Sequence, residues 1–264
     1  MYEFQYHKPA DLAAAADLLG QADDGTLMAG GQTLIPTLKQ RLAQPSDVVD
    51  LGAIGDLVGI SQDGDNVVIG AMTTHAAVAA SDVVRGAIPA LADLADGIGD
   101  PAVRNRGTIG GSVANSDPAA DYPAAVVGLG ATVVTTAREI AADDFFTGMF
   151  ETALNDGEII TSIRFPVADG AAYMKLPNPA SRYAIVGVFV ARTGGGIRVA
   201  VTGAGPSVFR VGDMESALAG GFSADAVGGI EIPADGLNAD IHASAEYRAA
   251  MVTVMAKRAV AAAG

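Results

Sequence analysis

The sequence predicts an α+β protein built from two or three subdomains, and three observations lead to this class. After a helical pattern at 10–19, strand-like runs at 26–29 and 48–51 flank a second helical pattern, so the first third of the chain forms a small β-α-β unit. Shorter strand-like runs separated by turn residues follow, up to about residue 202. A long helical pattern at 245–262 ends the chain, and no repeat or long linker interrupts it.

The opening unit contains two predicted helices and two predicted strands. The helix at 10–19 has Asp11 in its first turn and Gly20 just after its end. A second helix follows from leucines repeated every four residues, ending with Leu42. The strands are expected at 26–29 and 48–51.

The middle of the chain predicts a mixture of strands and short helices. Strands at 57–60 and 67–69 flank a turn-rich connection, and we expect them to form a hairpin. Thr73 or Thr74 is placed to cap a short helix ending near Ala80. The remaining elements predicted here are a helix at 88–98, a buried strand within 124–137, and strands at 131–135 and 158–165.

The last third predicts a three-stranded sheet followed by helices. The strands are expected at 172–176, 184–192 and 197–202, with a glycine run turning between the last two. A short helix at 213–218 precedes the terminal helix, which Ser244 is placed to cap.

Composition excludes several kinds of chemistry. The 264 residues include 30 acidic and 16 basic side chains, a net charge of -14 that argues against binding to a phosphate backbone. There is no cysteine, so disulfides, thiolate metal sites and iron–sulfur clusters on this chain are excluded. No secretory leader or apolar run of spanning length is present, so we expect a cytoplasmic protein without a transmembrane segment.

Two glycine pairs are the candidate binding motifs. The first, AGGQTLIP at 29–36, follows a predicted strand and opens a predicted helix. Glycine lets the main chain turn tightly and lets a ligand approach without a Cβ in the way. The second, TIGGSVANSDPAAD at 108–121, combines backbone donors with Thr, Ser and Asn side chains and two carboxylates.

Two such loops suit a nucleotide diphosphate, because backbone N–H groups bind anions without basic side chains. Asp117 and Asp121 would repel phosphate and better suit ribose or ribityl hydroxyls, or a role in holding the loop. The alternative is purely structural: a strand-to-helix turn at the first glycine pair and a bulge at the second. Neither a P-loop motif nor a G-x-G-x-x-G joining strand to helix is present.

Taken together, the two motifs resemble those of the FAD-binding medium subunit of molybdenum hydroxylases, the xanthine dehydrogenase and aerobic carbon monoxide dehydrogenase family. The resemblance covers essentially the whole chain. The segments 47–60, 67–78, 157–166 and 244–260 look most similar to the carbon monoxide dehydrogenase branch.

The resemblance implies a vanillyl-alcohol-oxidase (PCMH)-type fold with FAD between an N-terminal two-part domain and a C-terminal domain. The implied domains are 1–55 and 56–166 for FAD binding and 167–264 for the C-terminal part. The implied FAD-binding residues are Ala29, Gly30, Gly31, Gln32, Thr33, Leu34, Thr108, Gly111, Ser112, Asn115, Asp121, Ile160, Lys175 and Tyr183.

Some of these positions have simpler interpretations. Lys175 lies in a predicted strand and is also read as a solvated edge residue, and Tyr183 as ordinary half-buried packing. His75 is expected to be structural. Arg104 and Arg106 precede the second glycine motif, where they would shield its acidic side chains or face a partner.

The function that the resemblance implies is electron transfer, with no catalytic residue and no metal on this chain. A large subunit would carry the molybdenum cofactor and a small subunit the 2Fe-2S clusters, in a dimer of three-chain units. FAD on this chain would pass electrons to an external acceptor. The alternatives are a self-contained FAD-dependent oxidoreductase of the same fold and a scaffold protein that has lost FAD.

Overall fold

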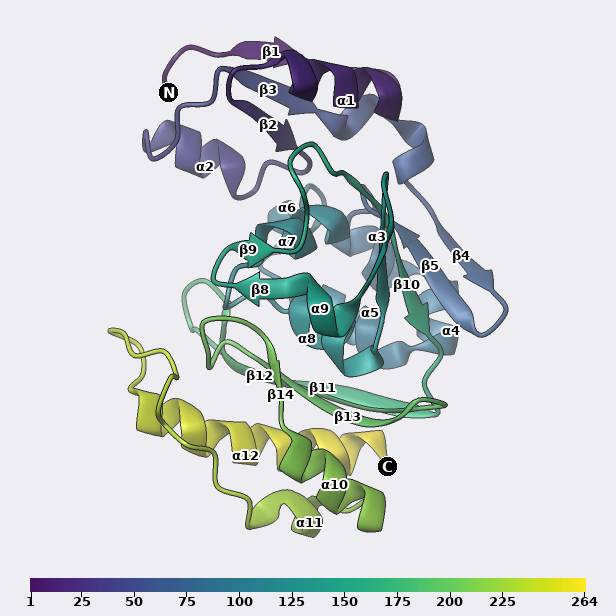
Figure 1. The fold of residues 1–264 in the computed structure, drawn as a ribbon. Helices are drawn as coiled ribbons and strands as arrows, with labels where there is room; N and C mark the ends of the chain where they lie inside the picture. Colours follow the sequence, from purple (N-terminus) through teal and green to yellow (C-terminus); the bar gives the residue numbers. More distant parts are fainter.

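A computed structural model describes all residues 1–264 and is drawn in Figure 1. The first part of the chain is a three-stranded parallel sheet in the order β1-β3-β2 with one helix against it and a second helix beyond the end of β2. These elements are β1 (Gln5–His7), α1 (Leu12–Gln21), β2 (Gly25–Met28), α2 (Leu34–Lys39) and β3 (Asp47–Asp50).

Both helices of this part end differently from the sequence prediction. Asp11 is the N-cap of α1 rather than part of its first turn, and accepts a hydrogen bond from the Ala14 N–H at 2.8 Å. The helix continues through Gly20 to Gln21. Helix α2 ends at Lys39, so Leu42 lies outside it and is 74% exposed. The leucine repeat therefore predicted a helix that is too long.

The central part is a five-stranded antiparallel sheet in the order β4-β5-β10-β6-β7, surrounded by short helices. The predicted hairpin is present, but β4 begins at Ile60, and the residues before it form a short 3-10 helix. Thr74 caps α3 as expected. The elements are η1 (Leu51–Ala53), η2 (Gly55–Leu57), β4 (Ile60–Asp63), β5 (Asn66–Gly70), α3 (His75–Ala80), α4 (Asp82–Ala87), α5 (Pro89–Asp96), α6 (Pro101–Arg104), α7 (Ile109–Asn115), α8 (Tyr122–Leu129), β6 (Thr132–Thr135), β7 (Glu139–Ala141), α9 (Ala142–Phe145), β8 (Phe146–Gly148), β9 (Glu151–Thr152) and β10 (Ile160–Pro166).

The prediction of a buried strand at 124–137 was wrong over its first half. Residues Tyr122–Leu129 form α8, with Pro123 at its start and Gly130 in the left-handed conformation at its end. All eight residues of α8 are buried. A helix buried on every side has no polar face, so its sequence lacks the helical alternation of apolar and polar residues and resembles a buried strand.

The last part of the chain is a sheet covered by a long helix. The sheet has four strands in the order β11-β12-β13-β14, not three, because the short β14 pairs with β13. Helix α12 packs against β11 and β12, and α8 packs against β12 and β13 (Figure 1). The elements are β11 (Gly170–Pro177), β12 (Ala184–Thr193), β13 (Gly196–Thr202), β14 (Phe209–Arg210), α10 (Gly212–Gly220), α11 (Ala224–Gly228) and α12 (Ala245–Ala263).

The three large sheets each have their own apolar cluster, and a small two-stranded sheet, β8-β9, has none, but the clusters cross the predicted domain limits. Phe189, Ala191 and Ala200 from the last sheet belong to the large central cluster. Ile159 belongs to the small N-terminal cluster. The central and C-terminal sheets thus pack together around α8, and the division at residues 55 and 166 stays a prediction.

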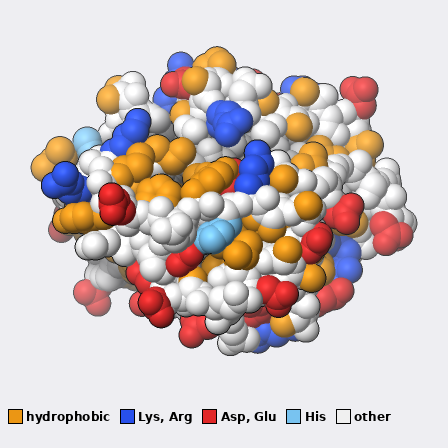
Figure 2. Space-filling model, turned by 90° about the horizontal axis from the view of Figure 1, so that it is seen from above, with side chains coloured by type: hydrophobic (Ala, Val, Ile, Leu, Met, Phe, Trp, Pro, Cys, Tyr) orange, Lys and Arg blue, Asp and Glu red, His pale blue; other side chains and the backbone are white.

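The surface shows how the charge of the chain is distributed. On the face seen in Figure 2, acidic and basic groups alternate with apolar side chains, and no continuous basic patch is present there. None of the helices has both the length and the apolar character needed to cross a lipid bilayer.

Candidate functional site

One cavity of about 640 Å³ lies between the N-terminal sheet, the central part and the first turn of the C-terminal part. This volume falls in the range of about 300–1,000 Å³ that is usual for small-molecule and cofactor sites. The cavity gathers thirteen of the fourteen residues predicted from the sequence, namely Ala29, Gly30, Gly31, Gln32, Thr33, Leu34, Thr108, Gly111, Ser112, Asn115, Asp121, Ile160 and Tyr183.

The first glycine loop presents a row of unused backbone donors. The N–H groups of residues 30–34 donate no hydrogen bond to any other part of the protein, and the next N–H, that of Ile35, donates to the Gly31 carbonyl at 3.1 Å. Gly31 has φ +71°, so the loop turns through the left-handed region before α2 begins. Successive free N–H groups around such a turn form a concave site for an anion.

The second glycine motif is a helix rather than a bulge, and its backbone is not free. The N–H of Ile109 donates to the Thr73 carbonyl at 3.1 Å, and that of Gly110 to the Ala71 carbonyl at 2.8 Å. The N–H of Gly111 donates to the Thr108 hydroxyl at 3.2 Å, which caps α7. The expectation that this loop exposes backbone donors was therefore wrong.

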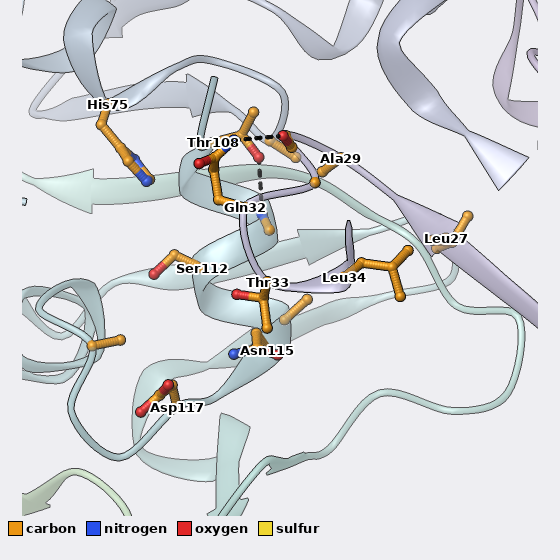
Figure 3. A pocket seen from close by; sticks show the side chains of 18 of the residues that line it. Leu27, Ala29, Gln32, Thr33, Leu34, His75, Thr108, Ser112, Asn115 and Asp117 are labelled. Atoms are coloured by element: carbon orange, nitrogen blue, oxygen red, sulfur yellow. Dashed lines mark hydrogen bonds between the residues drawn. The ribbon is translucent and has the colours of Figure 1, made fainter. Parts of the chain in front are cut away.

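What α7 offers to the cavity is side chains. Figure 3 shows the polar ends of Ser112 and Asn115 directed toward the same space as the Thr33 hydroxyl, with His75 and Asp117 at its border. The side chains of Thr33, Ser112 and Asn115 make no hydrogen bond within the protein, and Thr33 does not cap α2. They are donors and acceptors available to a ligand.

The glycines allow the two motifs to approach each other closely. A Cβ on Gly30 would lie 2.0 Å from the Arg106 carbonyl oxygen, and one on Gly111 would lie 3.0 Å from the Thr108 hydroxyl oxygen and 3.2 Å from the Ala29 Cβ. Glycine is needed here because two loops from different sheets touch each other at the cavity wall.

Lys175 is placed differently from both interpretations of its sequence position. It does not line the cavity, and its side chain is only 11% exposed, so it is not a solvated edge residue either. Its Nζ donates to the Gly97 carbonyl at 2.9 Å and lies 3.0 Å from Oδ1 of Asp121. Tyr173 donates to the same carboxylate at 2.6 Å.

The carboxylate of Asp121 is therefore fixed at the cavity wall by Lys175 and Tyr173. Burial raises the pKa of the Asp121 carboxyl, and the Lys175 ammonium and the Tyr173 hydroxyl oppose that shift. Asp117 has no cationic partner and accepts only the Ala119 N–H, and burial raises the pKa of its carboxyl. The two carboxylates therefore have different roles, one fixed by protein groups and the other available at the cavity.

Tyr183 and Ile160 also line the cavity. Tyr183 is 47% exposed, and partial burial and the two nearby carboxylates raise its pKa. Ile160 is buried at the beginning of β10. Arg182, which also lines the cavity, has φ +62° and forms the tight turn that presents Tyr183.

Some cavity residues were not predicted as part of the site. His75 is buried against the Tyr122 ring, and burial, with a smaller effect of Arg104, lowers its pKa to about 4. Glu158 precedes β10 and carries no local motif. In the structure, Thr74 forms a β-bridge with Thr108 of the second motif, which brings the neighbouring His75 to the cavity. In the sequence, the only signal near His75 is the predicted helix cap at Thr73 or Thr74.

Comparison with known proteins places this site in a family. The model for the FAD binding domain in molybdopterin dehydrogenase matches residues 2–168, which include both glycine motifs. The chain belongs to this family of FAD-binding subunits. FAD is therefore the cofactor of this subunit, as the sequence resemblance implied.

Individual relatives support the same assignment over the whole chain. The FAD-binding subunit is 38% identical to the carbon monoxide dehydrogenase medium chain of Hydrogenophaga pseudoflava, over 98% of this chain and 96% of the relative. It is 36% identical to the nicotine 6-hydroxylase medium subunit of Paenarthrobacter nicotinovorans, over 98% and 97%. A chain of the reconstituted CO dehydrogenase from Oligotropha carboxidovorans superimposes with a TM-score of 0.90 at 37% identity, covering 99% of this subunit and 97% of that chain.

These matches confirm the α+β FAD-binding fold and the resemblance to the medium subunits of molybdenum-containing dehydrogenases. The two curated relatives are named for different substrates, yet the subunit is almost equally identical to both. Identity in this chain therefore does not separate one substrate from another.

Proposed function

We propose that this subunit carries FAD in the cavity between its two glycine motifs and transfers electrons for a molybdenum hydroxylase. The observation that carries the proposal is the row of free N–H groups at 30–34, facing the unbonded side chains of Ser112 and Asn115. Backbone donors on one wall and hydroxyl and amide groups on the other suit a pyrophosphate joined to polyhydroxyl chains.

Each wall has a separate task in this proposal. The loop at 30–34 binds the pyrophosphate through its backbone, and Thr108, Ser112 and Asn115 bind the remaining phosphate oxygens and the ribityl or ribose hydroxyls. Ile160 and Tyr183 border the flavin ring, and Tyr183 shields it at the mouth. When bound, the isoalloxazine ring accepts and releases electrons, while the protein orients it and excludes water.

The proposed electron donor is an iron–sulfur cluster of a small partner subunit, which is itself reduced by a large molybdenum subunit. The relatives are named as medium chains or subunits, which supports a complex of three kinds of chain. We propose a dimer of such three-chain units, of the carbon monoxide dehydrogenase type, with an external acceptor reoxidising the flavin. No acid or base on this chain is needed for the transfer.

Titration of the purified chain with FAD tests the binding proposal. We expect a bound flavin spectrum, with loss of affinity in Asn115→Leu and Ser112→Ala but unchanged folding by circular dichroism. If the wild-type chain stays colourless, it binds no FAD, and the alternative of a scaffold protein that has lost FAD is favoured. Normal affinity in both variants would place FAD elsewhere.

Reduction of the flavin tests the electron-transfer proposal. Loaded chain alone is expected to stay oxidised with hydroxylase substrates, and to become reduced when coexpressed large and small subunits are added. Reduction by a substrate without any partner would favour the self-contained oxidoreductase instead.

A further inference from the structure

The cavity is lined by more negative than positive side chains. Three carboxylates line the cavity, Asp117, Asp121 and Glu158, and one guanidinium, Arg182, lines it with them. This wall is acidic in a chain whose net charge is already -14. An anionic ligand in such a cavity meets electrostatic repulsion unless the carboxylates are neutralised.

Two cations outside the cavity lining pair with two of these carboxylates, Asp121 and Glu158, whereas Asp117 has no cationic partner. Lys175 lies 3.0 Å from one oxygen of Asp121 and donates to the other at 3.2 Å. Arg138 donates to both oxygens of Glu158, from Nε at 3.1 Å and from Nη2 at 3.2 Å. Neither cation is among the cavity residues.

The burial of the two carboxylates strengthens the electrostatic effect of these pairs. The side chain of Asp121 is 4% exposed and that of Glu158 is 2% exposed, so water screens neither charge. The Thr135 hydroxyl also donates to Glu158 at 2.6 Å, and these contacts lower the pKa of that carboxyl to about 2. Both groups are thus held as paired carboxylates.

The cations also fix the walls mechanically. Lys175 comes from β11 in the C-terminal part and bonds to the Gly97 carbonyl, next to the cavity residues Ile98 and Gly99. Its other bond, to Asp121, holds the segment that begins α8. One ammonium therefore joins two walls of the cavity that are distant in sequence.

We propose that Lys175 and Arg138 are positioning residues that make this acidic cavity able to hold a dianionic cofactor, by cancelling Asp121 and Glu158 from outside it. The proposal rests on the proposed location of FAD in this cavity. It assigns Lys175 a role through Asp121 rather than contact with the cofactor. Arg104 does not share this role, because its guanidinium pairs with Asp96.

The test compares a flavin that carries the pyrophosphate with one that does not. FAD and riboflavin share the ring and ribityl chain, but only FAD carries the charged pyrophosphate and the adenosine attached to it. Calorimetric titration of the apo chain is expected to give a dissociation constant for FAD raised about tenfold or more in Lys175→Met and Arg138→Met, because an unpaired buried carboxylate then faces the phosphates. Binding of riboflavin is expected to change by less than about threefold, since it carries no charge.

A compensating variant separates the charge effect from damage to the fold. Asp121→Asn combined with Lys175→Met removes both charges and is expected to return the FAD constant to within about threefold of wild type. Arg198→Met removes a cation paired with Asp143, away from the cavity, and is the matched control that should leave FAD binding unchanged.

Several results would overturn the proposal. If both single variants bind FAD as tightly as wild type, or lose riboflavin and FAD by the same factor, the cations do not act through charge. If Lys175→Met does not fold by circular dichroism, the double variant and Arg138→Met decide the question in the same way. A wild-type chain that binds no FAD would instead contradict the proposed function.

Discussion

At the scale of single residues, the cavity depends on contacts that leave no space for a side chain. The loop at 30–34 reaches its position because Gly30 lies directly against the Arg106 carbonyl. The loop then reverses through Gly31 at positive φ. These two residues place five unused N–H groups at one wall of the cavity. We therefore expect that adding even a methyl group at either glycine weakens ligand binding.

Gly30→Ala tests this close approach. The new Cβ would lie 2.0 Å from the Arg106 oxygen, so the two loops must separate, at a cost of about 1–3 kcal/mol in the free energy of unfolding. We expect loss of bound FAD, measured by the flavin to protein absorbance ratio, and a lower melting temperature. Gly20→Ala is the control: nothing lies within 4 Å of its Cβ, and in α1 it should stabilise by about 1 kcal/mol. Full flavin content in Gly30→Ala would show that the loops tolerate separation.

His75 carries a pH dependence of stability. Burial lowers its pKa in the folded chain to about 4, from an ordinary value of 6.5, so the unfolded chain binds the proton more strongly. Stability is then fully present above pH 6.5 and falls as the pH drops toward 4, by up to about 3 kcal/mol. Denaturant unfolding between these pH values should show a smaller fall in His75→Phe.

The exposed His242 provides the control for this measurement. His242→Gln should keep the wild-type pH dependence, because its ring is not buried. An identical fall in wild type and His75→Phe would mean that groups other than His75 account for the pH dependence.

At the scale of helices and strands, the cap of α7 connects stability with binding. The Thr108 hydroxyl accepts the Gly111 N–H at 3.2 Å, and Thr108 also bridges to Thr74 ahead of α3. Ser244 makes the equivalent cap of α12, where it accepts the Tyr247 N–H at 3.2 Å. The two caps are chemically alike, but only one of them lies at the cavity.

Thr108→Ala and Ser244→Ala should therefore be equal in stability and different in binding. Each loses one capping hydrogen bond, worth about 1 kcal/mol in the free energy of unfolding. Only Thr108→Ala should weaken FAD binding, measured by quenching of flavin fluorescence. Equal FAD affinity in the two variants would show that the position of α7 does not depend on its cap.

Elements with sharp local features were predictable from the sequence, and α8 shows why others were not. The terminal helix α12 has a serine cap and an acidic first turn, and its prediction agrees with the structure to within one residue at its end. Helix α8 is buried on all sides, so neither caps nor periodicity distinguish it from a buried strand. The short β14 has only two residues, too few to show any period.

The candidate site also has parts that could be predicted from the sequence and parts that could not. The two glycine motifs are continuous in sequence, and both line the cavity. The pairs that neutralise its wall are not continuous: Lys175 and Asp121 are 54 positions apart, and Arg138 and Glu158 are 20 positions apart. Such pairs form only when the chain has folded. The charged residues can be read from the sequence, but which residue pairs with which cannot.

At the scale of the whole molecule, the C-terminal sheet completes the central core. Phe189 of β12 is fully buried in the central cluster, stacks on Tyr173 and contacts α8 at Gly128. The aromatic ring therefore belongs to the core of a part of the chain other than its own sheet. This packing couples the C-terminal sheet to the elements that form the cavity.

Phe189→Ala should lower the free energy of unfolding by about 3–5 kcal/mol, because it leaves a cavity in this shared core. Calorimetry of wild type should show one cooperative transition for the whole chain, and Phe189→Ala should shift it down as a unit. The control Val254→Ala, on a 36% exposed residue of α12, should change stability by less than about 0.5 kcal/mol. Two separate transitions in wild type would show that the C-terminal part unfolds independently.

The contact between Gly30 and Arg106 also has a consequence for the life of the protein in the cell. It joins a loop of the N-terminal sheet to a loop of the central part, and FAD bound across both loops, as proposed above, would tighten that junction. At a hundredfold excess over its dissociation constant, a ligand adds about 2.7 kcal/mol of stability by mass action. The supply of riboflavin, from which FAD is made, should then affect the amount of this protein as well as its activity. Cells starved of riboflavin should degrade the subunit faster. A variant with weaker FAD binding should regain its normal amount in riboflavin-rich medium.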